Sequence, residues 1–316
     1  MASVEILLAT FNGEAHLAEQ LDSLLRQDYH DWRVLIRDDG STDGTVTLLQ
    51  RYVANYPKRF FWAENSSKRL GLVGNFSALM QCATAPYVMF CDQDDIWWPD
   101  KISVSLAHLQ MLENHQPEGP ALVYTDLAVC DDNAVRRADS YWVFQHIDPE
   151  LALHPAGALI QDNATGNTFI FNQALNRLAA PVPAQAPGHD WWVALVALYA
   201  GRIDYLNRST LDYRQHARNA SGQKGLALAE LFKKLPGYCV TMRVGYLQAG
   251  WLVQRLHRHL SPANARLLQS HAALPSASLL TRLRALFRWG YWRVSDRRAR
   301  FKLLYLLFCR KCHHAG

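Results

Sequence analysis

The chain lacks an apolar run long enough for a membrane-spanning helix: nowhere in its 316 residues do about 18 apolar residues follow one another. The start of the chain, MASVEILLATFNG, has no basic segment ahead of a long apolar one, which argues against a secretory signal peptide. Only six cysteines are present, and they are scattered. Without an export signal, this spacing argues against a disulfide framework and predicts a protein of the reducing cytoplasm.

Acidic residues are scarce in the last third of the chain. Residues 217–316 hold 18 Lys+Arg and 2 Asp+Glu, a net charge of +16, so residues 1–216 hold 15 and 26, a net charge of −11. Such asymmetry predicts an anionic partner for the basic part. We therefore divide the chain into an α/β domain over residues 1–222 and a basic, amphipathic helical region over residues 223–316.

The basic region contains a segment, residues 279–308, in which apolar and basic residues separate at helical spacing. Leu279, Leu283, Leu286 and Phe287 are predicted on one face, and Arg282, Arg284 and Arg288 elsewhere. This pattern favours an interfacial helix on an anionic membrane and thus a peripheral membrane protein. The alternative is a set of helices that pack on the first domain and turn basic faces outward.

Strand-like and helix-like segments alternate in the first half. The strands are VEILLAT, WRVLIRDDG, RFFWAEN and YVMFC, and helical spacing separates them over residues 14–27, 41–53 and 73–83. This order predicts an α/β fold with a doubly wound, mostly parallel sheet flanked by helices. After residue 120 we expect a strand pair in ALVYTDLAVCD, and two short strands in RIDYLN and TLDYRQH.

Polar residues follow the predicted strands where each one ends: Thr10, Phe11 and Asn12, then Asp38 and Asp39, then Asp92, Gln93, Asp94 and Asp95. Ligands of such sheets bind beyond the carboxyl ends of the strands. Three acids within four positions repel one another unless a cation lies among them. The Asp-x-Asp spacing suits a hard cation such as Mg²⁺ that also binds phosphate oxygens. The alternative is an acidic N-cap for the helix near Pro99.

Six motifs in order carry a resemblance to a known family: ATFNG (9–13), RDDGSTDGT (37–45), NSSKRLGLVGNF (65–76), CDQDDIWWPDK (91–101), GHDWW (188–192) and YRQHARN (213–219). Over residues 3–220 the chain resembles glycosyltransferase family 2, and it is most similar to the bacterial rhamnosyltransferase-like branch that builds lipopolysaccharide and other surface polysaccharides. The resemblance implies a GT-A fold, a nucleotide-sugar donor, inversion at the anomeric carbon and Mg²⁺ or Mn²⁺ as cofactor.

The resemblance also implies which residues bind the donor: Thr10, Phe11, Asn12, Asp38, Asp39, Lys68, Arg69, Asn75, Asp92, Gln93, Arg214 and His216. Thr10 to Asn12 would border the base and ribose, although Phe11 stands where the family more often has Tyr. Asp38 or Asp39 would accept the pyrimidine N3–H, with Asp39 slightly favoured. Arg214 and His216 would hold the diphosphate. The metal ligands would be Asp94, Asp92 and His216, with Asp94 the more direct ligand.

Asp190 matches the general base of the family. Direct displacement needs one base to take the proton of the acceptor hydroxyl. The alternative role for Asp190 is an N-cap, because a helix is predicted to begin there. The acceptor side is predicted to include Asp126, Gly166, Asn167, His189, Trp191 and Trp192. The two tryptophans would exclude water and offer a sugar a flat apolar face.

These expectations define a metal-dependent inverting glycosyltransferase on the cytoplasmic face of the inner membrane. The predicted donor is dTDP-L-rhamnose, and the predicted acceptor is a lipopolysaccharide core or a lipid-linked O-antigen. A UDP-hexose donor is the alternative, since uracil and thymine present the same N3–H. A nucleotidyltransferase would need a glycine-rich, basic loop after the first strand, which FNGEAH lacks. A non-enzymatic anion-binding protein, or a nucleic-acid binder, would not line its cleft with Asp.

Overall fold

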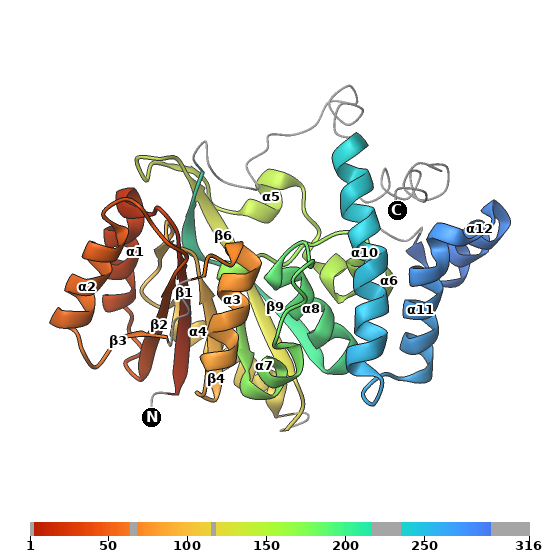
Figure 1. Ribbon diagram of the computed structural model, residues 1–316, viewed down its shortest axis with the longest axis horizontal. Helices are drawn as coiled ribbons and strands as arrows, with labels where there is room; N and C mark the ends of the chain where they lie inside the picture. The colour runs from red at the N-terminus through yellow and green to blue at the C-terminus, as the bar shows by residue number, and fades with distance from the viewer. Residues whose placement is uncertain (1–2, 64–67, 115–117, 216–234, 292–316) are drawn as a thin grey trace.

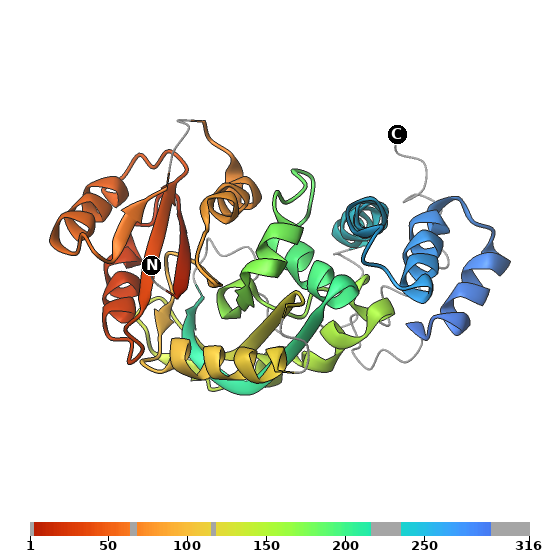
Figure 2. The same ribbon diagram turned by 90° about the horizontal axis from the view of Figure 1, so that it is seen from below.

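The computed structural model describes residues 3–63, 68–114, 118–215 and 235–291 (Figure 1). A twisted sheet with helices on both faces forms the larger part. A group of three helices follows at the other end of the long axis, as Figure 2 shows from below. The α/β class predicted from the alternation of strands and helices is confirmed.

One sheet contains all the strands of the described residues, in the order β3-β2-β1-β4-β8-β6-β9-β5, with β7 paired to β6. Their bounds are β1 Val4–Thr10, β2 Trp32–Asp38, β3 Phe60–Trp62, β4 Tyr87–Cys91, β5 Ile96–Trp97, β6 Ala121–Cys130, β7 Arg136–Ala138, β8 Ile170–Asn172 and β9 Arg202–Arg214. The first four of these strands along the chain are parallel, as are β6 and β9. The short β8 joins the two parts and runs antiparallel to both.

The helices cover both faces of this sheet. They are α1 Glu14–Leu25, α2 Thr45–Asn55, α3 Gly71–Cys82, α4 Lys101–Glu113, α5 Tyr141–Gln145, α6 Pro155–Ala158, α7 Gln173–Ala179, α8 His189–Ala200, α10 Leu235–Leu256, α11 Pro262–Ala273 and α12 Leu279–Arg288, with 3₁₀ turns η1 Pro149–Leu153, η2 Gly166–Thr168 and η3 Leu274–Ser276. None of the helices within the described ranges is both long and apolar enough to cross a membrane.

Two hydrophobic cores lie on opposite faces of the sheet, because successive side chains of a strand point to opposite sides. In β1, Ile6 and Leu8 belong to the core under α1 and α4, whereas Leu7 belongs to the core under α3, α7 and α8. All seven residues of β1 are buried. Burial on both faces explains the nearly continuous apolar run VEILLAT in place of an alternating pattern.

The expected strand divisions after residue 120 were wrong. A single strand, β6, replaces the predicted pair, and a single strand, β9, replaces the two short ones. The two strands pair in parallel over their length, and register shifts on both sides of Asp126 keep them paired. A β-bulge of this kind absorbs extra residues without ending a strand. Asp126, which interrupts the apolar run of ALVYTDLAVCD, therefore lies within β6 and does not end a strand.

The three C-terminal helices extend the core on the α8 side of the sheet. Leu252, Leu268 and Leu286, one from each helix, join that core. Arg255 of α10 donates to the carbonyls of Ala180 and Pro181, at 2.9 and 3.0 Å. The predicted domain boundary at residues 222 and 223 lies outside the described residues.

The predicted faces of α12 need correction. Leu286 and Arg282 are buried, whereas Leu279 and Phe287 are exposed. The guanidinium of Arg282 donates to the carbonyls of Leu274, Pro275 and Ala277 and so fixes the start of α12 to the end of η3. One edge of the helix therefore packs inward, and the exposed apolar stripe is narrower than the sequence indicated.

Candidate active site

The carboxyl ends of β1 and β2 are tied together by Asp38. Its carboxylate accepts hydrogen bonds from the Thr10 hydroxyl at 2.8 Å and from the backbone N–H groups of Gly40 and Ser41 at 3.0 and 2.7 Å. Asn12, which has a left-handed φ of 49°, accepts from the N–H of Thr42 at 2.8 Å. These bonds fix the shape of the loops that follow β1 and β2.

Asp39 is buried and bound to a buried arginine. Arg37 Nη1 lies 2.9 Å from its Oδ1, and the N–H groups of Leu70 and Gly71 donate at 2.6 and 2.8 Å. Burial opposes ionisation of Asp39, but these hydrogen bonds and the Arg37 charge outweigh it and hold the pKa below the usual value. Asp39 therefore fixes the start of α3 as an ionised carboxylate.

Three further residues that were predicted to bind the nucleotide-sugar lie near Asp39 or Arg37. Asn75 is buried and accepts from Arg37 Nη1 at 3.0 Å, so it supports Arg37 from within the fold. Lys68 is exposed, and its carbonyl accepts from Arg37 at 2.8 Å. The Arg69 guanidinium is exposed and lies 4.0 Å from the centre of the Phe11 ring. Arg69 and Phe11 together present a cationic and aromatic surface beside the loops that follow β1 and β2.

The loop after β4 carries the acids. Gln93 holds it against the loop after β1, because its amide accepts from the Phe11 N–H at 2.9 Å and donates to the Phe11 carbonyl at 3.1 Å. Asp92 is half-buried. Burial raises the pKa of Asp92 to about 7, and the nearby carboxylates of Asp94 and Asp190 add to the rise. Asp190, almost a hundred positions further along the chain, thus lies in the field of the Asp92–Asp94 pair.

Asp95, the next residue in the loop after Asp94, is buried, and the charge of the buried Lys101 acts on its carboxyl group. Its Oδ2 accepts from Asn167 Nδ2 at 2.5 Å, while Oδ1 is buried without a hydrogen bond. Burial raises the pKa of Asp95 well above the usual value. Lys101 is fully buried, and burial lowers its pKa to about 7 against the opposing charge of Asp95. Sequence reasoning missed Lys101 as part of the site, although it ends the same acidic motif.

Asp190 lies in the first turn of α8. The residue at the cap position is Gly188, so the N-cap alternative for Asp190 is wrong. One carboxylate oxygen, Oδ1, accepts from the Trp191 N–H at 2.8 Å, and Oδ2 faces the Gly166 N–H at 3.3 Å. A Cβ on Gly166 would lie 2.9 Å from the Asp190 Cβ, which is too close. Gly166 is therefore required for the approach of η2 to the carboxylate.

His189 lies beside Asp190 in an aromatic setting. Its ring stacks on Phe76, with centroids 3.8 Å apart, and meets Phe90 edge-on at 4.7 Å. Burial lowers the pKa of His189, so the ring is neutral. Within the described part of the chain, neither ring nitrogen has a hydrogen-bond partner, and the Nε2 atom lies close to Gly166.

Several predicted contact residues instead support the site from within. Trp191 and Trp192 are buried, and their indole N–H groups donate to the carbonyls of Ala158 and Ala179 at 2.7 and 2.9 Å. The prediction that they offer a face to an acceptor sugar is corrected, because α8 is apolar on all sides and lies in the core. Asp126 is also buried, and it accepts from the N–H groups of Tyr141 and Trp142 at the start of α5.

Arg214 lies at the end of β9 and is buried. It is 2% exposed, and its guanidinium donates to the carbonyls of Asp94 and Asp132 at 3.2 and 2.6 Å. A third contact joins it to the carboxylate of Glu19. Arg214 thus supports the backbone of the Asp94 loop, in place of the predicted direct contact with the donor. His216 lies outside the described residues.

The acidic loop fits a divalent cation. Asp92 and Asp94 offer hard carboxylate oxygens, and their mutual repulsion, expressed in the raised pKa of Asp92, would be relieved by a bound cation. Within residues 3–63, 68–114, 118–215 and 235–291, no group of three or more His, Cys, Asp or Glu side chains could hold a metal ion by itself. Two carboxylates suit Mg²⁺ or Mn²⁺ that takes its remaining ligands from water and phosphate.

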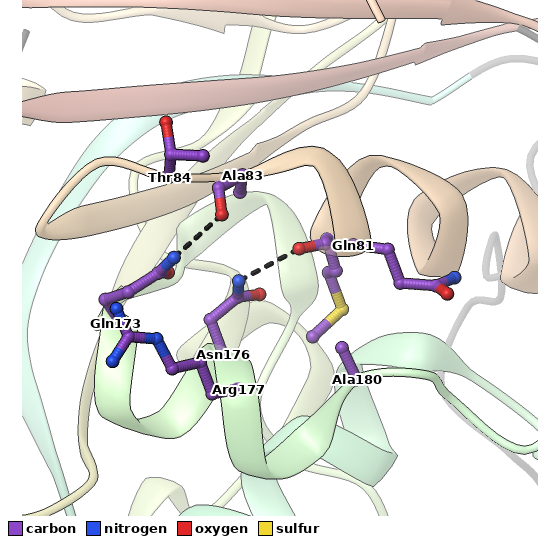
Figure 3. Close-up of a pocket in the computed structure, with 8 residues that line it drawn as sticks. Gln81, Ala83, Thr84, Gln173, Asn176, Arg177 and Ala180 are labelled. Carbon is purple, nitrogen blue, oxygen red and sulfur yellow. Dashed lines mark hydrogen bonds between the residues drawn. The ribbon is translucent and has the colours of Figure 1, made fainter. Parts of the chain in front are cut away.

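A hollow of about 310 Å³ lies near the start of β4, at the end of that strand away from the acidic loop (Figure 3). Its lining comes from α3, α7 and the segments beside them: Met80, Gln81, Ala83, Thr84, Gln173, Asn176, Arg177 and Ala180. Gln173 and Asn176 donate to the carbonyls of Ala83 and Met80 at 2.7 and 2.9 Å. These bonds join α7 to the end of α3, away from the acidic loop.

Comparison with known proteins identifies the class of this fold and site. Residues 5–175 match the model of Glycosyl transferase family 2, which is more than half of the chain, and the chain belongs to that family. Its structure has the GT-A fold: Staphylococcus aureus TarS aligns with a TM-score of 0.57 at 17% identity, over 98% of this chain and 55% of that one.

Several curated relatives match the sequence, among them one from Shigella flexneri and one from Bacillus subtilis. The dTDP-rhamnosyl transferase RfbG of Shigella flexneri is 29% identical over 222 residues, which cover 68% of this chain and 73% of RfbG. The putative glycosyltransferase EpsE of Bacillus subtilis is 30% identical over 135 residues, which cover 43% of this chain and 46% of EpsE. The matched part is therefore about half the length of EpsE and of TarS.

Proposed function

We propose that this protein is a metal-dependent, inverting glycosyltransferase that moves L-rhamnose from dTDP-L-rhamnose to a lipopolysaccharide core or lipid-linked O-antigen. One observation carries the proposal: Asp190 lies in the field of the Asp92–Asp94 pair, with an oxygen at the surface of η2. A base and a cation site at one crevice match the needs of direct displacement at a sugar carbon.

The reaction requires Asp190 to act on the acceptor. Its carboxylate takes the proton of the acceptor hydroxyl while the hydroxyl oxygen attacks the anomeric carbon of the donor, and the bond to the nucleoside diphosphate breaks. Attack on a β-linked donor leaves an α-linked rhamnose. The hydrogen bonds from Trp191 and Gly166 orient the carboxylate, and buried Arg214 holds the neighbouring Asp94 loop in place.

Asp92 and Asp94 would hold Mg²⁺ or Mn²⁺, with Asp94 the more direct ligand and His216 a further candidate. The bound cation supplies positive charge to the departing diphosphate. Burial and the neighbouring acids raise the pKa of Asp92. The negative charge of Asp92 is therefore costly until a cation binds beside it.

The donor nucleotide would lie along the rim formed by Thr10, Phe11 and Asn12. Phe11 and Arg69 offer a surface for the base, and Lys68 is exposed beside them. The 29% identity to a dTDP-rhamnosyl transferase supports dTDP-L-rhamnose. A UDP-hexose remains the alternative donor, since the two pyrimidines share the N3–H that Asp38 or Asp39 would accept. Gly166, Asn167 and His189 are proposed to border the acceptor.

The place of action is proposed to be the cytoplasmic face of the inner membrane, where the protein is peripheral. The acceptor is then a glycolipid of that surface, and the basic C-terminal helices hold the enzyme close to it. This part of the proposal is supported by the charge of +16 over residues 217–316.

A panel of nucleotide-sugars, each with and without Mn²⁺, tests the donor in a thermal-shift measurement, because a ligand that binds the folded state raises the melting temperature. The proposal predicts a metal-dependent rise with dTDP-L-rhamnose that exceeds the rise with dTDP alone. A metal-dependent rise with UDP-sugars only would replace the donor. An absence of any rise with every donor, in the presence of acceptor extract as well, would contradict the transferase proposal.

A further inference from the structure

The outer side of α12 carries large apolar side chains in contact with solvent. Leu280 is 57% exposed and Phe287 is 71% exposed, with Leu279 at 49% at the start of the helix. Leu280, Leu283 and Phe287 follow one another at i, i+3 and i+7, which places them on one stripe. We name the exposed side chains of Leu279, Leu280 and Phe287, together with the half-buried Leu283 between them, the α12 ridge.

The inner side of the same helix is firmly attached, so the ridge has a fixed orientation. Ala285 and Leu286 are buried, and Arg282 is buried with its guanidinium on three backbone carbonyls. Ser278 caps the helix by accepting from the Thr281 N–H at 3.2 Å. The opposite face of α12 packs against the rest of the protein, so the ridge faces away from the core.

Positive charge without compensating acid surrounds the ridge. Arg284 and Arg288, one helical turn apart, are exposed along its side. Residues 243–291, which include all of α11 and α12, contain seven arginines and neither Asp nor Glu. An exposed basic patch without local acids attracts an anionic partner, while the apolar ridge requires a partner that also accepts hydrocarbon side chains.

We propose that the α12 ridge docks on the surface of a membrane that contains anionic lipids, with its leucines and Phe287 in the interfacial region and Arg284 and Arg288 on the headgroups. A lipid surface offers apolar contact and negative charge side by side along a helix. α12 lies at the outer end of the molecule, beyond α10 and α11, where a flat surface can reach it (Figure 1). This inference deepens the proposed function and rests on it only in the need for a membrane-borne acceptor.

Vesicle co-sedimentation of the full chain, without donor or acceptor, tests the ridge directly. Vesicles of phosphatidylcholine with about one third phosphatidylglycerol are expected to bind the protein, and pure phosphatidylcholine vesicles much less. The double variant Leu280→Ser/Phe287→Ser is expected to bind at least about ten-fold more weakly, since two exposed apolar side chains lose their contact with lipid. Arg284→Gln/Arg288→Gln is expected to weaken binding and its dependence on salt.

A matched control is Met111→Ser/Val143→Ser, which removes two apolar side chains of 64% and 74% exposure from α4 and α5. It is expected to bind vesicles as the unmodified chain does. Equal binding by the ridge variant would overturn the proposal. So would a lower molecular mass of the ridge variant in solution, which would assign the ridge to a second copy. A fall in melting temperature with unchanged vesicle binding would assign it to residues 292–316 of the same chain.

The vesicle measurement is independent of glycosyl transfer. If vesicles bind through the ridge but no nucleotide-sugar raises the melting temperature, the docking inference stands and the proposed transferase fails. If a nucleotide-sugar raises the melting temperature equally in the unmodified chain and the ridge variant, while vesicles bind neither, the transferase stands and the docking inference fails.

Discussion

Asn167 and Asp95 join two loops from distant parts of the chain: Nδ2 of Asn167 lies 2.5 Å from Oδ2 of Asp95, and both side chains are buried. Asp95 follows Asp94 in the acidic loop, and Asn167 follows Gly166, whose N–H faces Asp190. This hydrogen bond therefore fixes the distance between the proposed cation site and the proposed base.

Removal of this link is expected to affect turnover more than donor binding. In Asn167→Ala, the turn at η2 loses its attachment to Asp95, and a misplacement of about 1 Å at a reacting group costs on the order of 100-fold in rate. Transfer kinetics are expected to show a lower kcat with a donor KM within a few-fold of the unmodified value. Partial recovery in Asn167→Gln would support positioning, whereas an equal loss of donor binding would indicate a structural role alone.

Gly166→Ala is expected to displace Asp190, because the added Cβ would meet the Asp190 Cβ at 2.9 Å and its Oδ2 at 3.3 Å. Transfer should fall about ten- to one hundred-fold while the nucleotide-induced thermal shift persists. Gly250→Ala is the matched control, since nothing lies within 4 Å of its Cβ position and it is inside α10. That variant should keep full activity and gain about 0.5–1 kcal/mol of stability. Full activity of Gly166→Ala would refute the packing argument.

Cation binding is expected to weaken as the pH falls. The pKa of Asp92 is raised to about 7, so the carboxyl is increasingly protonated below that pH, and a cation must displace the proton. Mn²⁺ affinity, measured by calorimetry with nucleotide present, should fall by up to about ten-fold per pH unit below pH 7. Asp92→Asn should bind Mn²⁺ weakly with little dependence on pH. Equal affinity at pH 6 and pH 8 in the unmodified chain would exclude Asp92 as a ligand.

His271 is expected to make the C-terminal helices sensitive to acid. It is buried and shares a 2.6 Å hydrogen bond with the Tyr291 hydroxyl, and burial lowers its pKa from 6.5 to about 3. Above pH 6.5 the ring is neutral in both states, but below it only the unfolded chain takes up the proton. Stability should thus fall by about 2 kcal/mol between pH 6.5 and pH 5.

Urea unfolding at several pH values measures this loss. His271→Gln should remove the corresponding part of the slope, whereas His257→Gln, at an exposed position of the turn after α10, should retain it. A slope that is the same in all three chains would show that His271 does not carry the effect.

The sequence was sufficient to predict the α/β fold and the gathering of acids at one crevice. Strands buried on both faces give continuous apolar runs, and the parallel strands β1, β2 and β4 place Thr10, Asp38 and Asp92 at the same edge of the sheet. Asp190 was found from its motif, and its place beside the acidic pair was not visible from spacing alone.

The direction in which individual side chains point could not be predicted. Trp191 and Trp192 look like a sugar platform in sequence, but α8 is buried on all sides and takes both into the core. Arg214 was predicted to hold the diphosphate, and in the structure its buried guanidinium donates to the carbonyls of Asp94 and Asp132. The buried cations Arg37 and Lys101 were missed because a basic residue beside acids usually lies in solvent, and only burial reveals their role.

Transfer catalysed by Asp190→Asn, compared with the unmodified chain, tests the central claim most directly. Both chains are supplied with labelled dTDP-L-rhamnose, Mn²⁺ and a membrane extract as acceptor source, and label is followed into the glycolipid fraction. We predict that the variant loses about 10²- to 10⁴-fold in transfer and keeps nucleotide binding within a few-fold, because only the base is removed. Transfer by the variant at the rate of the unmodified chain would contradict the assignment of Asp190 and with it the proposed mechanism.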